Sequence, residues 1–171
     1  MATVLFQDQT YDLAGELPAA GSRAPGFRLT DGALRDRTLA DFPGRVKILN
    51  IVPSLDTPVC EISAGKFRAQ CDALPNTVVL HISMDLPFAQ ARCKTAGGST
   101  HSIPLSAFRY PEFGLAYGVR ISNGPLEGLL SRSVLVLGPD DVVAYRQLVP
   151  VIEREPDYEA ALAAARRLTA G

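Results

Sequence analysis

The chain has 171 residues, of which 47% are hydrophobic and 20% are charged, so it is long and apolar enough for one domain with a full core over residues 1–171. A net charge of −1 and an isoelectric point near 6.1 argue against a nucleic-acid surface, and three cysteines, an odd number, do not suggest a structural disulfide framework. No segment reaches the roughly 18 apolar residues of a membrane span, and the N-terminus lacks a basic-then-apolar signal pattern, so the cytoplasm is the expected compartment.

Apolar β-branched runs predict the strands, and Gly or Pro positions bound the helices. Short elements are expected first: strands at 3–6 and 10–13 that form an N-terminal β-hairpin, a loop at 18–25, a strand at 27–29 and a helical turn at 38–42. The main strands are expected at 47–52, 77–83, 133–137 and 142–146, and helices at 58–71, 87–95, 112–117 and 157–168. A βαβ unit followed by a β-hairpin and a closing helix is the order of an α/β thioredoxin-like fold with a mixed sheet.

Cys60 lies where a buried strand passes into a helix. Thr57 is a good N-cap, and Pro58 suits the first helical position because its missing N–H would be unpaired there. Cys60 then takes the third helical position, where free N–H groups and the helix dipole favour an anionic sulfur. We therefore expect the pKa of Cys60 to lie well below the free value of about 8.5. The alternative is a buried, inert cysteine that packs as a small hydrophobic residue.

Residues 57–60 are similar to a Cys-x-x-Cys redox motif whose first cysteine has become Thr57. Such a site keeps an activated sulfur but loses its immediate partner, so it suits attack on an external electrophile better than dithiol exchange. Two other function classes stay in view. One is a thioredoxin-like disulfide carrier or isomerase, which needs the adjacent pair, and the other is a non-catalytic binding module.

Several separated segments, in the same order, resemble the bacterial thiol peroxidases, a branch of the peroxiredoxins. The stretch from Pro53 to Cys60 resembles their active-site motif. Further similar segments are residues 85–90, 108–119, 124–126 and 155–162. The resemblance spans nearly the whole chain. It implies a thioredoxin-like fold, a peroxidase without metal or organic cofactor, and commonly a homodimer.

The resemblance also implies that Cys60 is the peroxidatic residue. Its thiolate would attack the peroxide O–O bond, release water or an alcohol, and become a sulfenic acid. A second cysteine would then form a disulfide with it, and a thioredoxin-like donor would reduce that disulfide. Pro53 and Thr57 match positions that shape the pocket, and Arg132 matches the family's active-site arginine.

Each implied role has a chemical reason. Arg132 would supply a cationic fork that favours the thiolate, Thr57 a hydroxyl for the peroxide, and Pro53 a rigid wall without an N–H. The alternative for Arg132 is a surface charge flanking a strand, and for Thr57 a helix cap alone. Capping and substrate contact by Thr57 are compatible.

Cys93 is the expected resolving cysteine. Cys71 lies eleven residues after Cys60 on the same predicted helix, about 16 Å along its axis, whereas a disulfide needs Cα atoms within about 7 Å. Cys93 lies in the last turns of the predicted helix 87–95. Because helix ends fray readily, Cys60 and Cys93 could each unwind locally and meet.

The segment around Cys93 departs from the family pattern by one residue. The family usually has Arg-Phe-Cys where this chain has Arg92-Cys93-Lys94, so Cys93 takes the phenylalanine position. Either the local loop absorbs the shift and Cys93 resolves, which we favour, or Cys93 is buried and an outside thiol resolves Cys60.

Other candidate residues carry weaker signals. His81 lies inside an apolar strand and is expected to have a satisfied ring rather than to act as a base, and His101 is expected in a solvent-facing loop. The cysteines and histidines contain no Cys-x-x-Cys or His-x-x-x-His pair, so we expect no metal site. Leu55, Leu86 and Phe88 would either favour alkyl hydroperoxides over hydrogen peroxide or simply pack in the core.

Overall fold

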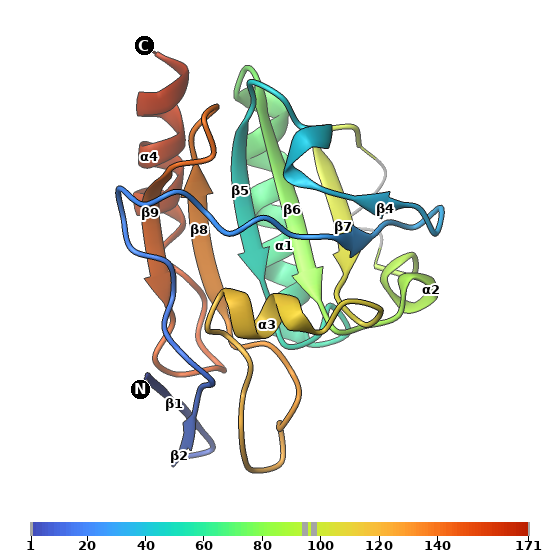
Figure 1. Cartoon of the computed structure of the whole chain (residues 1–171), viewed down its shortest axis with the longest axis vertical. Helices are drawn as coiled ribbons and strands as arrows, with labels where there is room; N and C mark the ends of the chain where they lie inside the picture. The colour runs from blue at the N-terminus through green and yellow to red at the C-terminus, as the bar shows by residue number, and fades with distance from the viewer. Residues whose placement is uncertain (1, 94–95, 97–98, 171) are drawn as a thin grey trace.

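The most apolar runs of the chain form the centre of a seven-stranded sheet in the computed structural model, which describes residues 2–93, 96 and 99–170 (Figure 1). β5 (Val46–Ile51), β6 (Thr77–Ser83) and β8 (Ser133–Leu137) are buried at every residue. β5 pairs parallel with β6 and antiparallel with β8, so the sheet is mixed. Strands covered on both faces are continuous apolar runs, and the sequence therefore predicts all three of them.

Four further strands extend the sheet to both edges in the order β4-β3-β7-β6-β5-β8-β9. β7 (Ser102–Ser106) pairs parallel with β6, and β9 (Val143–Leu148) pairs antiparallel with β8. β3 (Leu29–Thr30) and β4 (Asp36–Arg37) complete the β7 edge. The site residues described below lie on β5, β6 and β7, on the segments that leave them, and just before β8 and α4.

Helices cover both faces of the sheet (Figure 1). α1 (Pro58–Ala73) and α4 (Tyr158–Thr169) pack on one face through a shared apolar cluster. The 3₁₀ turn η1 (Leu39–Asp41) and α3 (Glu112–Ala116) pack on the other face, where Phe113 and Leu39 join a second cluster. Within the described residues, no helix combines the length and the apolar character needed to cross a membrane.

The predicted N-terminal hairpin is confirmed. β1 (Thr3–Phe6) and β2 (Gln9–Asp12) pair antiparallel as a separate two-stranded sheet. Gln7 and Asp8 at the turn have φ values of 50° and 62°, which matches the right-handed twist of a two-residue hairpin. The thioredoxin-like α/β fold predicted from the sequence is confirmed as well.

The predicted helix 87–95 is wrong in length. α2 (Pro87–Gln90) is a single turn, Cys93 lies beyond it, and residues 94 and 95 fall outside the described residues. The Gln90 side chain donates to Ser83 Oγ at 3.0 Å and to Leu105 O at 2.9 Å, which ties the end of the turn to the sheet. Short helices depend on such tertiary contacts, so the local sequence overestimates this one.

The sequence analysis did not predict strand β7. Pro104 lies in its middle, and a proline within a run normally argues against a strand because it cannot donate to a ladder. β7 tolerates Pro104 because its other neighbour, β3, pairs with it only through Thr30 and Ser106.

Candidate active site

Cys60 occupies the third residue of α1, as the sequence predicts, and its side chain is fully buried. Thr57 is extended at the N-cap position, with φ −118° and ψ 150°, and Pro58 begins the helix. The sulfur therefore lies close to the N-terminal end of a 16-residue helix, where unpaired amides and the dipole favour negative charge.

The sheet brings Arg132 to this sulfur from a segment 72 residues further along the chain. Arg132 Nη1 donates to Cys60 Sγ at 3.3 Å, and Arg132 Nε donates to Ile152 O at 2.8 Å. Ile51 of β5 pairs with Ser133 of β8, so the residue before β8 faces the connection between β5 and α1. Arg132 is only 2% exposed, which rules out a surface charge that merely flanks a strand.

Three residues that the sequence analysis did not single out lie near Arg132. Lys66 Nζ donates to Glu155 Oε1 at 3.0 Å, and the Tyr158 hydroxyl donates to the same oxygen at 2.8 Å. These two hydrogen bonds, aided by the positive charges of Lys66 and Arg132, lower the pKa of Glu155. Burial and the neighbouring Glu155 raise the pKa of Tyr158. Glu155 and Tyr158 belong to a segment that carries the family resemblance.

The Thr57 hydroxyl does not cap α1, so that part of the sequence-based expectation is wrong. It donates instead to Ser54 O at 3.2 Å. Asp85 holds the same loop by two hydrogen bonds: its carboxylate accepts from Ser54 Oγ and from Leu55 N, both at 2.8 Å. Pro53 is buried at the start of this loop. Asp85 lies in another segment that carries the resemblance, which is the signal that could have identified its role.

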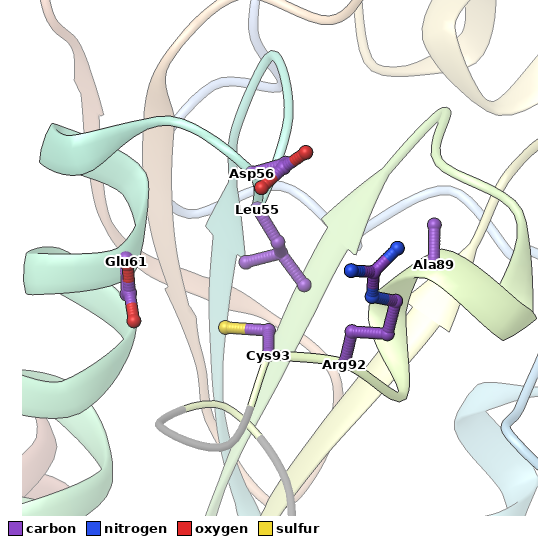
Figure 2. Close-up of a pocket in the computed structure, with 6 residues that line it drawn as sticks. All are labelled: Leu55, Asp56, Glu61, Ala89, Arg92 and Cys93. Carbon is purple, nitrogen blue, oxygen red and sulfur yellow. The ribbon is translucent and has the colours of Figure 1, made fainter.

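Cys93 borders a cleft of about 180 Å³ between the start of α1 and the end of α2 (Figure 2). Figure 2 shows its sulfur directed across the cleft toward α1, on which Glu61 lies, with Leu55 above it. Cys93 is partly buried and packs against an apolar cluster to which Cys60, Leu55 and Ala96 belong. The two cysteines predicted to react together therefore contact one cluster.

Cys71 lies far along the same helix and faces a different environment. It is 1% exposed and packs in the cluster between α1, α4 and the sheet. Burial, with a smaller contribution from Asp72, raises the pKa of its thiol to about 12. None of the three cysteines, all of which lie within the described residues, forms a disulfide.

The structure confirms that the His81 ring is hydrogen-bonded at both nitrogens. Nδ1 lies 3.0 Å from Asn50 Nδ2, and Nε2 lies 2.8 Å from Ser102 Oγ. Burial lowers the pKa of His81 to about 3. His101 lies exposed in a loop, with its Nδ1 3.0 Å from Arg45 Nη2. The described part of the chain contains no group of three or more His, Cys, Asp or Glu residues that could hold a metal ion.

Two of the three apolar side chains considered above are not core residues. Leu55 is buried at the site, but Leu86 is 45% exposed and Phe88 is 68% exposed. Leu86 and Phe88 line an apolar groove with Leu34 and Phe108, and this groove shares no lining residue with the Cys93 cleft.

Comparison with known proteins finds matches over nearly the whole chain. A family model described as redoxin matches residues 19–162. A thiol peroxidase of Mycobacterium tuberculosis is 48% identical over 164 residues, which cover 96% of this chain and 98% of that protein. The structure of a peroxiredoxin-like protein from Aquifex aeolicus is similar with a TM-score of 0.90 and 34% identity, covering 98% of each chain. A thiol peroxidase from Chromobacterium violaceum gives a TM-score of 0.86 and 25% identity, covering 96% of this chain and 95% of its own.

These matches include the segments that carry Cys60, Cys93 and Arg132. From its sequence, fold and site together, the chain belongs to the redoxin family and, within it, to the thiol peroxidases of the peroxiredoxin branch.

Proposed function

We propose that this thiol peroxidase reduces hydrogen peroxide and alkyl hydroperoxides through Cys60. The Cys60 sulfur attacks one peroxide oxygen, so an S–O bond forms while the O–O bond breaks. The other oxygen leaves as hydroxide or alkoxide and takes up a proton to give water or an alcohol. The peroxide is thereby reduced by two electrons, and Cys60 is oxidised to a sulfenic acid.

The contact between Arg132 and Cys60 is the observation that carries this proposal. A guanidinium 3.3 Å from the sulfur stabilises the anion before attack. Its N–H groups can then donate hydrogen bonds to the peroxide oxygens, which gain negative charge as the O–O bond breaks. The hydrogen bond from Arg132 Nε to Ile152 O holds the fork in place. The Thr57 hydroxyl donates to Ser54 O and has lone pairs with which to accept from a peroxide O–H. Pro53 forms the wall of the pocket.

We propose further that Cys93 resolves the sulfenic acid. Its sulfur attacks Cys60 Sγ, water leaves, and a disulfide forms. A thioredoxin-like dithiol then supplies two electrons and two protons and returns both cysteines to thiols. Packing of Cys93 against the cluster that contains Cys60 supports this assignment, and the buried Cys71 offers no competing thiol. The cytoplasm, where thiols are kept reduced, suits this cycle.

The test is a single turnover of the reduced protein. Rapid-mixing measurements should show fast consumption of one equivalent of peroxide, followed by a Cys60–Cys93 disulfide in peptide maps. Cys60→Ser should abolish the reaction. Cys93→Ser should still consume one equivalent and stop at a sulfenic acid that dimedone traps. A Cys60–Cys71 bridge, or no intramolecular bridge at all, would reject Cys93 as the resolving residue.

A thioredoxin-like disulfide carrier is the alternative that the sequence left open. It requires a second cysteine next to Cys60 in the motif, and position 57 holds a threonine whose hydroxyl is bound to Ser54 O. No observation in the described residues favours this alternative. Transfer of a disulfide to a dithiol substrate without peroxide would support it against the peroxidase mechanism.

We also propose a homodimer formed through the apolar groove of Leu34, Leu86, Phe88 and Phe108, which has a volume of about 390 Å³. Phe88 and Phe108 are 68% and 60% exposed, and gathered exposed apolar side chains mark interaction surfaces. Sedimentation velocity should show a dimer that Phe88→Glu converts to a monomer. Leu5→Glu, at an exposed leucine of the β1–β2 hairpin, is the control and should leave the dimer intact.

A further inference from the structure

A row of buried hydrogen bonds crosses the sheet beneath the site and ends on the two segments that carry the reacting cysteines. It runs from the first turn of α1, over the neighbouring strands β5, β6 and β7, to Ala96. The groups joined are, in order, Cys60 O, Ser63 Oγ, Asn50 Nδ2, the His81 ring, Ser102 Oγ and Ala96 O.

The first part of this row holds the start of α1. Ser63 Oγ donates to Cys60 O at 3.0 Å, and Asn50 Nδ2 donates to Ser63 Oγ at 3.5 Å. The same amide nitrogen lies 3.0 Å from His81 Nδ1. Asn50 and His81 are direct partners in the parallel pairing of β5 with β6, so the sheet register itself aligns them.

The second part holds Ala96, three residues after Cys93. His81 Nε2 lies 2.8 Å from Ser102 Oγ, and the Ser102 hydroxyl donates to Ala96 O. Ala96 N in turn donates to Cys93 O at 3.3 Å. Ala96 is buried in the same apolar cluster as Cys60.

The direction of every hydrogen bond in the row is fixed by its chemistry. An amide nitrogen such as Asn50 Nδ2 only donates, so His81 Nδ1 must accept, and the remaining ring proton lies on Nε2 and is donated to Ser102. This arrangement requires a neutral ring, and burial lowers the pKa of His81 to about 3, well below neutrality. The row is therefore continuous under ordinary conditions.

A polar row in this place costs stability and so calls for an explanation. Asn50 Oδ1 is buried and has no hydrogen-bond partner among the described residues, whereas apolar residues at these strand positions would leave no such atom. The row therefore does more than fill the core between α1 and the sheet.

Disulfide formation requires movement beside this row. No disulfide joins Cys60 and Cys93 in this structure, and a disulfide brings two sulfurs to about 2.0 Å. At least one of the two segments has to move, and the row is anchored to the carbonyl of Cys60 on one side and to that of Ala96 on the other. Each of its hydrogen bonds therefore favours the arrangement in which Cys60 faces Arg132.

We propose that His81 is a positioning residue that links the two cysteine segments and slows the step from sulfenic acid to disulfide. The inference rests on the proposed peroxidase cycle. While the row is intact, α1 begins at Pro58 and Cys60 stays beside Arg132, ready for peroxide. When the row opens, Cys60 and Cys93 approach each other. His81 thereby sets how long the sulfenic acid persists and how much of it a second peroxide oxidises to sulfinic acid.

The test measures how the sulfenic acid partitions. Reduced His81→Met and Ser102→Ala proteins are mixed with one equivalent of peroxide, and disulfide formation is followed in time. We expect it to be about threefold to tenfold faster than in the wild type, the change in an equilibrium that follows loss of one buried hydrogen bond. With excess peroxide, the sulfinic acid yield at Cys60 should fall in proportion. His81→Gln, which keeps a donor and an acceptor, should lie between wild type and His81→Met.

Thr77→Val is the matched control, because it removes another buried hydroxyl at the far end of β6, one that donates to Pro75 O. It should lower stability and leave the partitioning unchanged, which separates positioning from general loosening. Ser102→Ala keeps the test intact if the larger change at His81 prevents folding. Disulfide formation in Ser102→Ala that matches Thr77→Val, or is slower than in the wild type, would overturn the inference. Failure of the peroxidase cycle itself would appear differently, as absence of fast peroxide consumption by the wild type.

Discussion

Cys60 and Cys71 lie on one helix, eleven residues apart, and both side chains are almost fully buried, at 0% and 1% exposure. Cys60 lies in the first turn, where the Arg132 guanidinium contacts its sulfur. Cys71 lies near the other end of α1 among apolar side chains and beside Asp72, and the pKa of its thiol is raised to about 12. Burial is therefore common to both cysteines and does not distinguish the proposed nucleophile, Cys60, from Cys71.

The difference lies in which end of the helix each sulfur occupies and in which charge faces it. The N-terminal end of a helix stabilises an anion and the C-terminal end destabilises one. Arg132 places a positive charge beside Cys60, and Asp72 places a negative charge near Cys71. Burial opposes a thiolate at Cys71 more strongly than the positive charge of Arg45 favours one, whereas the Arg132 guanidinium contacts the Cys60 sulfur directly.

The largest effect should come from removing one sulfur or the other. Cys60→Ser should reduce peroxide consumption by several orders of magnitude, because the nucleophile itself is lost. Cys71→Ser should leave the rate of the first turnover within about twofold of the wild type, since Cys71 packs in a different apolar cluster from Cys60. Rapid-mixing kinetics with the two variants measure this directly. Comparable losses of rate in the two variants would contradict the proposed difference between Cys60 and Cys71.

Removing the positive charge beside Cys60 should have the next largest effect. Arg132→Gln should slow the attack on peroxide by about a hundredfold or more, the usual result of deleting one preorganised donor. Arg146→Gln is the control, because Arg146 is an exposed arginine that also donates to a backbone carbonyl, that of Leu17. Circular dichroism checks that both variants fold. An unchanged rate in Arg132→Gln would remove Arg132 from the mechanism.

Thiol alkylation should distinguish Cys60 from Cys71, because the thiolate, not the thiol, is the nucleophile. Iodoacetamide at pH 8 should label Cys60 and Cys93 of the native protein but label Cys71 only after unfolding, because the folded protein holds Cys71 as a thiol. Mass spectrometry of peptides reports each site.

The raised pKa of Cys71 also predicts how stability depends on pH. The contribution of the Cys71 thiol to the free energy of unfolding is fully present below its unfolded pKa of about 9.0. It is lost as the pH rises toward 12, at about 1.4 kcal/mol per pH unit. Cys71→Ala should remove this loss.

The smallest effect should appear in the free energy of unfolding of the two serine variants. Cys71→Ser places a hydroxyl among apolar side chains and should cost about 1–3 kcal/mol. Cys60→Ser should cost less, because Arg132 Nη1 can donate to the new oxygen as it does to the sulfur. Urea titrations measure both values. A larger loss for Cys60→Ser would mean that the Arg132 contact does not compensate for burial of the hydroxyl.

Local signals were enough to predict the elements that surround Cys60. The apolar run before Pro53 and the proline at position 58 fix a buried strand followed by a helix start, and Cys60 falls in the first turn as a result. The long helices and central strands follow in the same way, because each depends on a periodic pattern within one segment. Short elements such as α2 and β7 were misjudged or missed because tertiary contacts, not their own residues, hold them.

The sequence by itself determined that a cysteine would lie at the amino end of a helix, since capping and proline preferences act over a few neighbouring residues. Only the tertiary structure decided that Arg132 touches its sulfur and that His81 links β5 to β7. These contacts depend on strand order and register, and no local preference encodes the pairing of residues that lie tens of positions apart.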